Sequence, residues 1–312
     1  MGNLFVEDKD IVVSKSPFST YEGEKRKFDG RKTNISTDHI MIKVKREDVF
    51  GVDYDIIKAI YDLHFSTSRM ITQHLNLKGI DIDQSKVQNR LNFLNRLNII
   101  SRYKIVNDET VANTRFYCLE NMGRVLLLSR DYKCHWKQTD SAVDLKKMKT
   151  VLARNQVLLT YRKKLKSIES YRDSDILDGN INPDLEIIIN GKNDKKNKMW
   201  FVVERSYEGW EDNIERKLRF FKSYLDNYKP KQGFTSPPAV VIVGEDDRHL
   251  FEVFKIILKE KLNPVESFFL YTSDLRVISK DIDKSLIEFT LEKDKGKYKP
   301  KIKELTYDLL KS

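Results

Sequence analysis

Two acidic residues stand at the ends of two predicted strands and could together hold a divalent cation. Asp184 directly precedes an apolar run at 185–190, and Glu204 ends a second run that begins at Met199. The Lys-rich segment between the runs, Gly191 to Lys198, predicts a hairpin. If the strands pair through that hairpin, the two carboxylates come close enough to bind Mg²⁺ through oxygen ligands.

This pattern resembles the PD-(D/E)xK nuclease superfamily, whose members bind magnesium with an Asp and a second acidic residue and activate water with a Lys two positions later. Ser206 occupies the position of that Lys, and a hydroxyl brings no positive charge to the reaction. The next predicted helix carries substitute cations at Arg216, Lys217 and Arg219. Glu169, which we expect on the preceding helix, could add a third carboxylate.

A structural role for the two carboxylates is the alternative, and the serine at position 206 favours it. In that interpretation Asp184 caps a turn and Glu204 pairs with a cation at a strand end. We therefore expect a nuclease-like domain without activity, in which Asp184 and Glu204 remain the candidate catalytic and metal-binding residues of a Mg-dependent endonuclease. The chain has neither a Walker pattern nor a dinucleotide fingerprint, so we expect no other cofactor.

A second group of residues has the side chains that recognise DNA bases. Asp83 can cap a helix whose inward seam is Val87, Leu91, Leu94 and Leu97. Asn and Gln side chains bind adenine in two places and Arg binds guanine, which suits insertion of this helix into the major groove. The residues expected on its outward face are Gln84, Ser85, Lys86, Gln88, Asn89 and Arg90.

The segments around that helix indicate the platform that would carry it. Asp53 and Thr67 are expected caps of two earlier helices. Strands at 100–106 and 114–119, joined by a turn at 107–113, would form a hairpin that brings cations to DNA phosphates, namely Arg102, Lys104 and Arg115. This block resembles the winged helix-turn-helix family over about residues 50 to 135. A winged domain that binds protein is the alternative.

The predicted helices and strands fall into two domains of different fold class. Residues 1–45 show no sustained period and predict a flexible arm, and 46–136 predict the winged helix-turn-helix, an α+β domain. Residues 145–279 predict a restriction-endonuclease-like α/β sandwich with a mixed sheet, which begins with a basic helix that runs to about Arg172. Residues 280–312 predict a basic helix or tail.

Composition narrows the class of partner and compartment. The 312 residues include 57 Lys and Arg against 47 Asp and Glu, a formal charge of +10 that favours polyanions. The two cysteines, Cys118 and Cys134, are too few for a disulfide framework and fit a reducing compartment. The amino terminus lacks the apolar core of a signal peptide and the apolar runs are too short to span a bilayer, so we expect a cytoplasmic protein without membrane association.

The combination of the two domains is similar to the replication-relaxation family of plasmids and integrative elements. The resemblance rests on Asn182 to Ile187, Trp200 to Arg205 and Asn213 to Tyr224, and members commonly have Gly and Thr where this chain has Ser206 and Tyr207. It implies a DNA-binding accessory in plasmid replication or conjugative transfer, which acts on double-stranded DNA beside a relaxase or initiator and could form a homodimer. A transcriptional regulator is a further alternative.

Overall fold

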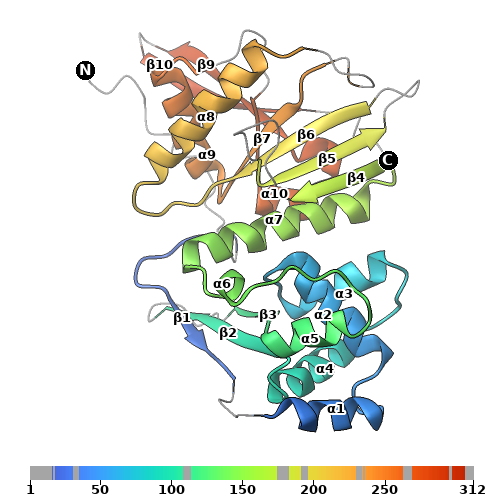
Figure 1. The fold of residues 1–312 in the computed structure, drawn as a ribbon. Coiled ribbons are helices and arrows are strands. Elements are labelled where there is room, and N and C mark those ends of the chain that lie inside the picture. The colour runs from blue at the N-terminus through green and yellow to red at the C-terminus, as the bar shows by residue number, and fades with distance from the viewer. Residues whose placement is uncertain are drawn as a thin grey trace. The chain divides into compact units, whose positions relative to one another are not determined.

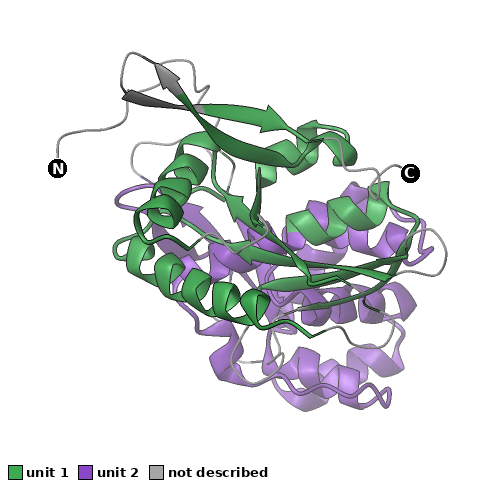
Figure 2. Cartoon of the chain, turned by 90° about the horizontal axis from the view of Figure 1, so that it is seen from above, with its two compact units in different colours: residues 1–20, 156–312 green, residues 21–155 purple. Residues whose placement is uncertain are grey.

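The structure, a computed structural model, divides into two compact units. Unit 1 joins Met1–Thr20 to Gln156–Ser312, and unit 2 is Tyr21–Asn155, so that unit 2 is an insertion in the sequence of unit 1 (Figure 2). The chain is mixed α and β, as the sequence predicted. The structure describes residues 16, 18–30, 35–107, 114–173, 183–190, 196–229, 234, 236–262, 269–294 and 297–305.

Unit 2 packs short helices around one apolar core and beside a small antiparallel sheet (Figure 1). The sheet has the order β1-β2-β3. Ile56, Ile60, Leu91 and Leu94 are fully buried, because apolar residues recur every three or four positions along their helices. The elements are β1 (Lys25–Phe28), α1 (Thr37–Lys45), α2 (Gly51–Leu63), α3 (Ser68–Leu77), α4 (Gln84–Arg96), β2 (Ile100–Val106), β3 (Arg115–Leu119), α5 (Asn121–Leu128) and α6 (Gln138–Ser141).

Side chains at the helix starts set where the helices of unit 2 begin. Thr67 caps α3 and Asp83 caps α4, as predicted, each through a side-chain oxygen that accepts from a backbone N–H three residues on. Asp53 takes part in capping α2, but not at the predicted position. The N-cap is Phe50, three residues earlier, and Asp53 is the third residue of the helix, whose carboxylate accepts from the Phe50 N–H at 3.0 Å.

The amino-terminal segment contains structure that the sequence did not predict. Residues expected in an arm without secondary structure form β1, which pairs with β2, and α1, which is capped by Ser36 and buries Ile40 completely. A four-residue strand is too short to display a period, and its hydrogen bonds come from a partner about 80 residues away. Only the tertiary fold reveals it.

Unit 1 is a layered α/β structure around a mixed sheet of order β10-β9-β8-β7-β6-β5-β4. Strands β6, β7 and β8 are parallel, joined by the crossover helices α8 and α9, and the remaining neighbours are antiparallel. The elements are α7 (Leu145–Lys164), which begins in unit 2, β4 (Ile168–Asp173), β5 (Leu185–Asn190), β6 (Lys196–Val203), α8 (Trp210–Asp226), β7 (Ala239–Gly244), α9 (Asp247–Lys259), β8 (Phe269–Ser273), α10 (Asp274–Ser279), the 3-10 turn Ile282–Lys284, β9 (Ile287–Asp294) and β10 (Lys297–Glu304).

Alternating residues of the central strand face two different helical layers. Trp200 and Val202 of β6 belong to the core formed with α8 and α9. Phe201, between them, meets the Tyr161 ring of α7 edge-on at 5.1 Å. Successive side chains of β6 therefore pack against helices on opposite faces of the sheet, and both faces of the strand are buried.

Two predictions for this half of the chain were wrong. The basic helix ends at Lys164 instead of Arg172, and residues 168–173 form β4, an edge strand paired with β5. The Lys-rich stretch after residue 280 contains the hairpin β9–β10 instead of a helix or tail. Both segments form strands because they pair with a neighbouring strand. Their charged local sequence does not predict that pairing. No helix among the described residues has the length and apolar character to cross a membrane.

Candidate functional site

Helix α4 is held to unit 2 by one face and exposes the other. Its inward residues Val87, Leu91 and Leu94 are completely buried in the core of the unit. Asp83 fixes the first turn because its carboxylate accepts from the Lys86 N–H at 2.8 Å. The first two turns therefore have a set orientation, and their polar side chains project outward.

Most of the predicted base-reading residues are exposed on those turns. They are Gln84, Ser85, Lys86, Gln88 and Asn89. The amides of Gln84 and Gln88 also donate weakly to the Ser68 hydroxyl of α3, at 3.3 and 3.4 Å. These two bonds are solvent-exposed and long, so a ligand could replace them at small cost.

Arg90, predicted to contact DNA, instead holds α4 to α2. Its guanidinium donates to both carboxylate oxygens of Asp53, at 2.7 and 2.5 Å, and to the Asp48 carbonyl at 2.8 Å. It also lies over the Phe50 and Phe93 rings. Because Asp53 is completely buried, this bidentate pair neutralises a charge inside the unit.

The three cations of the predicted β2–β3 hairpin differ in what they contact. Arg102 donates to the Asp29 carbonyl at 2.9 Å and to Asn92 of α4 at 2.6 Å, and it pairs with the Asp29 carboxylate. Arg115 pairs with that same carboxylate at 3.2 Å but keeps 61% of its side chain exposed. Lys104 is half-buried on β2. Most of the predicted turn between the strands, residues 108–113, lies outside the described residues.

In unit 1 the two candidate carboxylates lie together at one edge of the β5–β6 hairpin. Asp184 directly precedes β5, Glu204 directly follows β6, and Leu185 pairs with Phe201 between them. The side chains are nearly inaccessible, with 8% and 1% exposure of the two acidic residues. One Asp184 oxygen accepts from the Val203 N–H at 2.9 Å, which fixes this carboxylate against β6.

Lys217 of α8 supplies the positive charge that residue 206 lacks. Its Nζ lies 3.7 Å from Asp184 Oδ2 and 3.5 Å from Glu204 Oε2, so a single ammonium group contacts both carboxylates. Burial alone would lower the pKa of Lys217, but the charges of Asp184 and Glu204 outweigh it and raise the pKa above its usual value. Of the three substitute cations that the sequence offered, Lys217 is the one that reaches the pair.

Other predicted members of the site lie elsewhere. Glu169 is on strand β4, not on a helix, and pairs with Lys196 at 2.5 Å. Ser206 donates both its N–H and its hydroxyl to Glu245, at 3.0 Å each. Arg219 binds Glu215 and Glu260 on the outer side of α8. Ser206 is therefore a structural residue of the turn after Glu204.

Asn213 is a member of the site that the sequence analysis missed. Its amide donates to Glu204 Oε2 at 3.2 Å and to the Tyr207 hydroxyl at 3.1 Å, and its carbonyl accepts from Arg216 at 3.1 Å. Asn213 lies one helical turn before Lys217, so both reach the same carboxylate. This spacing of four was the signal in the sequence that could have identified it.

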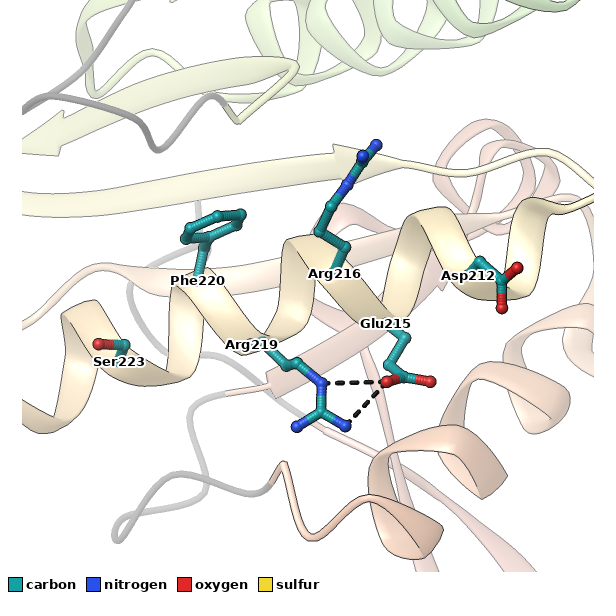
Figure 3. A pocket seen from close by; sticks show the side chains of 6 residues that line it. All are labelled: Asp212, Glu215, Arg216, Arg219, Phe220 and Ser223. Atoms are coloured by element: carbon teal, nitrogen blue, oxygen red, sulfur yellow. Dashed lines mark hydrogen bonds and ion pairs between the residues drawn. The ribbon is translucent and has the colours of Figure 1, made fainter.

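The outer side of α8 is hollowed beside these residues. Figure 3 shows Arg216 and Phe220 on one side of the helix, and Glu215 bonded to Arg219 on the other. The hollow measures 500 Å³ and is lined by Asp212, Glu215, Arg216, Arg219, Phe220 and Ser223. Neither Asp184 nor Glu204 lines this hollow. The charges of its two acidic residues equal those of its two arginines.

The turn after Glu204 is anchored by buried polar contacts at the ends of the parallel strands. Glu245, which follows β7, also accepts from the Thr20 N–H at 2.9 Å. Arg205 is fully buried and pairs with the buried Asp274 at 3.4 Å. His249 accepts from the Glu245 N–H and meets the Trp210 ring edge-on at 4.5 Å. Burial lowers the pKa of His249 to about 4, with the Arg205 charge adding to the effect and Glu245 opposing it.

The donor set at Asp184 and Glu204 fits magnesium better than zinc. Among the described residues no group of three or more His, Cys, Asp or Glu side chains is arranged to hold a metal ion. Magnesium commonly takes only one or two carboxylates and completes its octahedron with water and phosphate oxygens. Asp184 and Glu204 offer that number of carboxylates, and Lys217 Nζ occupies the point on which they converge in this structure.

Comparisons of the chain with family models, curated proteins and solved structures found no match. The resemblance to the replication-relaxation family therefore stays a prediction from the residues that carry it.

Proposed function

We propose that this chain is a double-stranded DNA-binding protein in which α4 reads base edges in the major groove. The order α2, α3, α4 and then the β2–β3 hairpin supports a winged helix-turn-helix arrangement of unit 2. The isolated bridge between Ser66 and Tyr117, which ties the segment before α3 to β3, is in keeping with it.

One observation carries the proposal: the first two turns of α4 expose donors and acceptors and no acidic side chain. Exposed amides and a lysine stand where a groove-binding helix contacts bases, while the opposite face anchors the helix in a core. Arg90 takes no part in the proposed contact, because Asp53 binds it. The base-reading set is reduced to Gln84, Ser85, Lys86, Gln88 and Asn89.

The test is binding of randomised duplexes followed by selection, for the unmodified chain and for a Gln88→Ala, Asn89→Ala double variant. We expect the variant to bind duplex DNA but to lose most of its preference between sites, since each good bidentate pair is worth about 1–3 kcal/mol of discrimination. An unmodified chain without affinity for any duplex at low ionic strength would refute the proposal.

A second candidate function, Mg-dependent hydrolysis of DNA phosphodiester bonds, is favoured by the position of Lys217. The sequence argued against activity because Ser206 replaces the expected Lys. Lys217 reaches both carboxylates from the next helix. This supports a site with two carboxylates and one lysine, as in the nuclease pattern given above.

The residues have separate parts in that candidate function. Asp184 and Glu204 would hold the metal ion, which polarises the phosphate and makes bound water more acidic. Lys217 would place its positive charge beside the phosphate, and its raised pKa keeps it protonated through neutral pH. Asn213 would keep the Glu204 carboxylate in position through the hydrogen bond at 3.2 Å.

Nicking of supercoiled plasmid in the presence of Mg²⁺ tests the second candidate. We expect nicking by the unmodified chain, none by an Asp184→Ala, Glu204→Ala double variant, and strong loss in Lys217→Gln. Lys222→Gln is a matched control on the same helix, because Lys222 pairs with Asp226 away from the site. Absence of nicking by the unmodified chain would leave DNA binding as the only proposed function.

A role in plasmid replication or conjugative transfer stays a prediction from the resemblance given above, as does transcriptional regulation. Relaxase or initiator genes beside the coding sequence would favour replication or transfer.

A further inference from the structure

The amino-terminal strand β1 brings two more lysines to the sheet of unit 2. It pairs antiparallel with β2 in a register that sets Lys27 opposite Lys104. Lys104 in turn lies opposite Arg115 of β3. Lys27, Lys104 and Arg115 therefore form a continuous row of positive charges across all three strands, which we call the cation row.

The cation row lies on the face of the sheet that also carries Ile100, Tyr117 and Leu119, which pack into the helical core of unit 2. Side chains alternate along a strand, and on β1 Lys25 and Lys27 are exposed while Arg26 and Phe28 turn to the other face. There Arg26 lies over the Tyr103 ring and Phe28 meets it edge-on at 5.5 Å. The contacts of Arg26 and Phe28 with Tyr103 therefore fix Lys25 and Lys27 on the opposite face of the strand.

This arrangement is unfavourable for the protein alone. Like charges directly opposite one another on neighbouring strands repel. Among the described residues no carboxylate lies within ion-pair distance of Lys25, Lys27 or Lys104, and Arg115 shares its one partner, Asp29, with Arg102. A polyanion laid along the row would turn the repulsion into attraction.

The row continues into the exposed side of α4. Arg102 is on the same face of β2 as Lys104, two residues away, and its guanidinium donates to Asn92 of α4 at 2.6 Å. Beside this contact the surface has a hollow of 740 Å³, lined by Phe28, Asp29, Gly30, Asn89, Asn92, Asn95, Arg96 and Arg102. The base-reading turns and the cation row therefore belong to one surface.

We infer that β1 is part of the DNA interface: Lys25, Lys27, Lys104 and Arg115 bind the phosphate backbone of the duplex whose groove α4 enters. The inference rests on the proposed DNA-binding function and adds to it a strand that precedes the whole helical block in sequence. Arg102 has a different role, because Asp29 and Asn92 already bind it, and it fixes the sheet to α4.

The test compares Lys25→Gln and Lys27→Gln with Lys133→Gln, which removes the same charge from an exposed loop residue after α5. Affinity for one duplex is measured as a function of salt concentration, and thermal unfolding of each protein is measured without DNA. Each phosphate contact contributes about 0.9 to the slope of log affinity against log salt, or roughly 3.5-fold between about 50 and 200 mM salt.

We expect both strand variants to lose about one contact each, equally for all duplex sequences, while Lys133→Gln matches the unmodified chain. Lys27→Gln should at the same time unfold at an equal or higher temperature than the unmodified chain, because it removes repulsion. If Lys25→Gln and Lys27→Gln bind like Lys133→Gln, or if Lys27→Gln loses affinity and thermal stability together, the inference is wrong. An unmodified chain that binds no duplex refutes the proposed function itself.

Discussion

The polar groups on the exposed face of α4 are solvated by water, whereas those of the Asp184–Glu204–Lys217 cluster are largely buried and stabilised by one another. On α4 the polar groups are hydrated, and the charged pair nearest to them, Lys86 with Asp83 at 3.6 Å, is more than half exposed. In the cluster two carboxylates are almost inaccessible, and they share one ammonium group as their cation. Residues of the first kind cost little to change, whereas residues of the second kind depend on one another.

The difference shows how a surface and a cluster can be told apart by experiment. Substitutions of the exposed side chains of α4 that have no buried partner should alter ligand binding and leave folding unchanged. Substitutions in the cluster should alter folding unless a ligand replaces the missing charge. The following predictions test that contrast, from the largest expected effect to the smallest.

Lys217→Met should lower the free energy of unfolding by about 4 kcal/mol, because it leaves two buried carboxylates without a cation. Magnesium should restore part of the loss if the carboxylates bind it. Urea unfolding with and without Mg²⁺ measures both effects. Lys86→Met, the same substitution on α4, should change stability by less than about 0.5 kcal/mol. Equal effects of the two substitutions would remove the contrast.

Arg90→Met should cost about 3 kcal/mol although Arg90 lies on α4, because it leaves the buried Asp53 carboxylate unpaired. At temperatures where the variant is folded, its preference between DNA sites should match that of the unmodified chain. Chemical unfolding and duplex selection are the two measurements. If the variant is stable and its preference between DNA sites changes, Arg90 contacts bases and this prediction is wrong.

The two units should respond to acid in different pH ranges. Since the folded state depresses the pKa of His249 from 6.5 to about 4, it binds fewer protons than the unfolded state between these values. The stability of unit 1 should therefore fall by roughly 2–3 kcal/mol as pH drops from about 6.5 to 4. The rings of His249 and Trp210 are in contact, so Trp210 fluorescence reports the change.

The stability that Asp62 contributes to unit 2 should persist through that range and be lost only at lower pH. Hydrogen bonds from His74, Lys78 and Tyr132 outweigh the effect of burial and lower the pKa of Asp62 to about 2. The stability that this carboxylate contributes is present above its ordinary pKa near 3.8 and is lost as pH falls toward 2. Trp136 reports on this unit, and His249→Gln should remove the acid response of unit 1 alone.

Asp83→Ala should cost about 1 kcal/mol, because the first turn of α4 loses the acceptor for the Lys86 N–H. Fraying of that turn should also weaken discrimination between DNA sites, which none of the cluster substitutions should do. Thr67→Ala removes the equivalent cap of α3 and is the matched control. Identical DNA-binding results for the two cap variants would argue against α4 as the reading helix.

The sequence by itself determined the elements that have a strong local signature. Apolar residues every three or four positions and a capping side chain predicted α3 and α4, and short, mainly apolar runs predicted β5 and β7, because these signals act within a few residues. The tertiary structure decided whatever depends on distant partners. Strand β1 exists through pairing with β2, Arg90 is occupied because Asp53 lies beside it, and Lys217 reaches Asp184 and Glu204 because the crossover helix packs against β6. Ion pairs and strand pairings depend on which residues are close in space. The periodicity of the sequence does not contain that information.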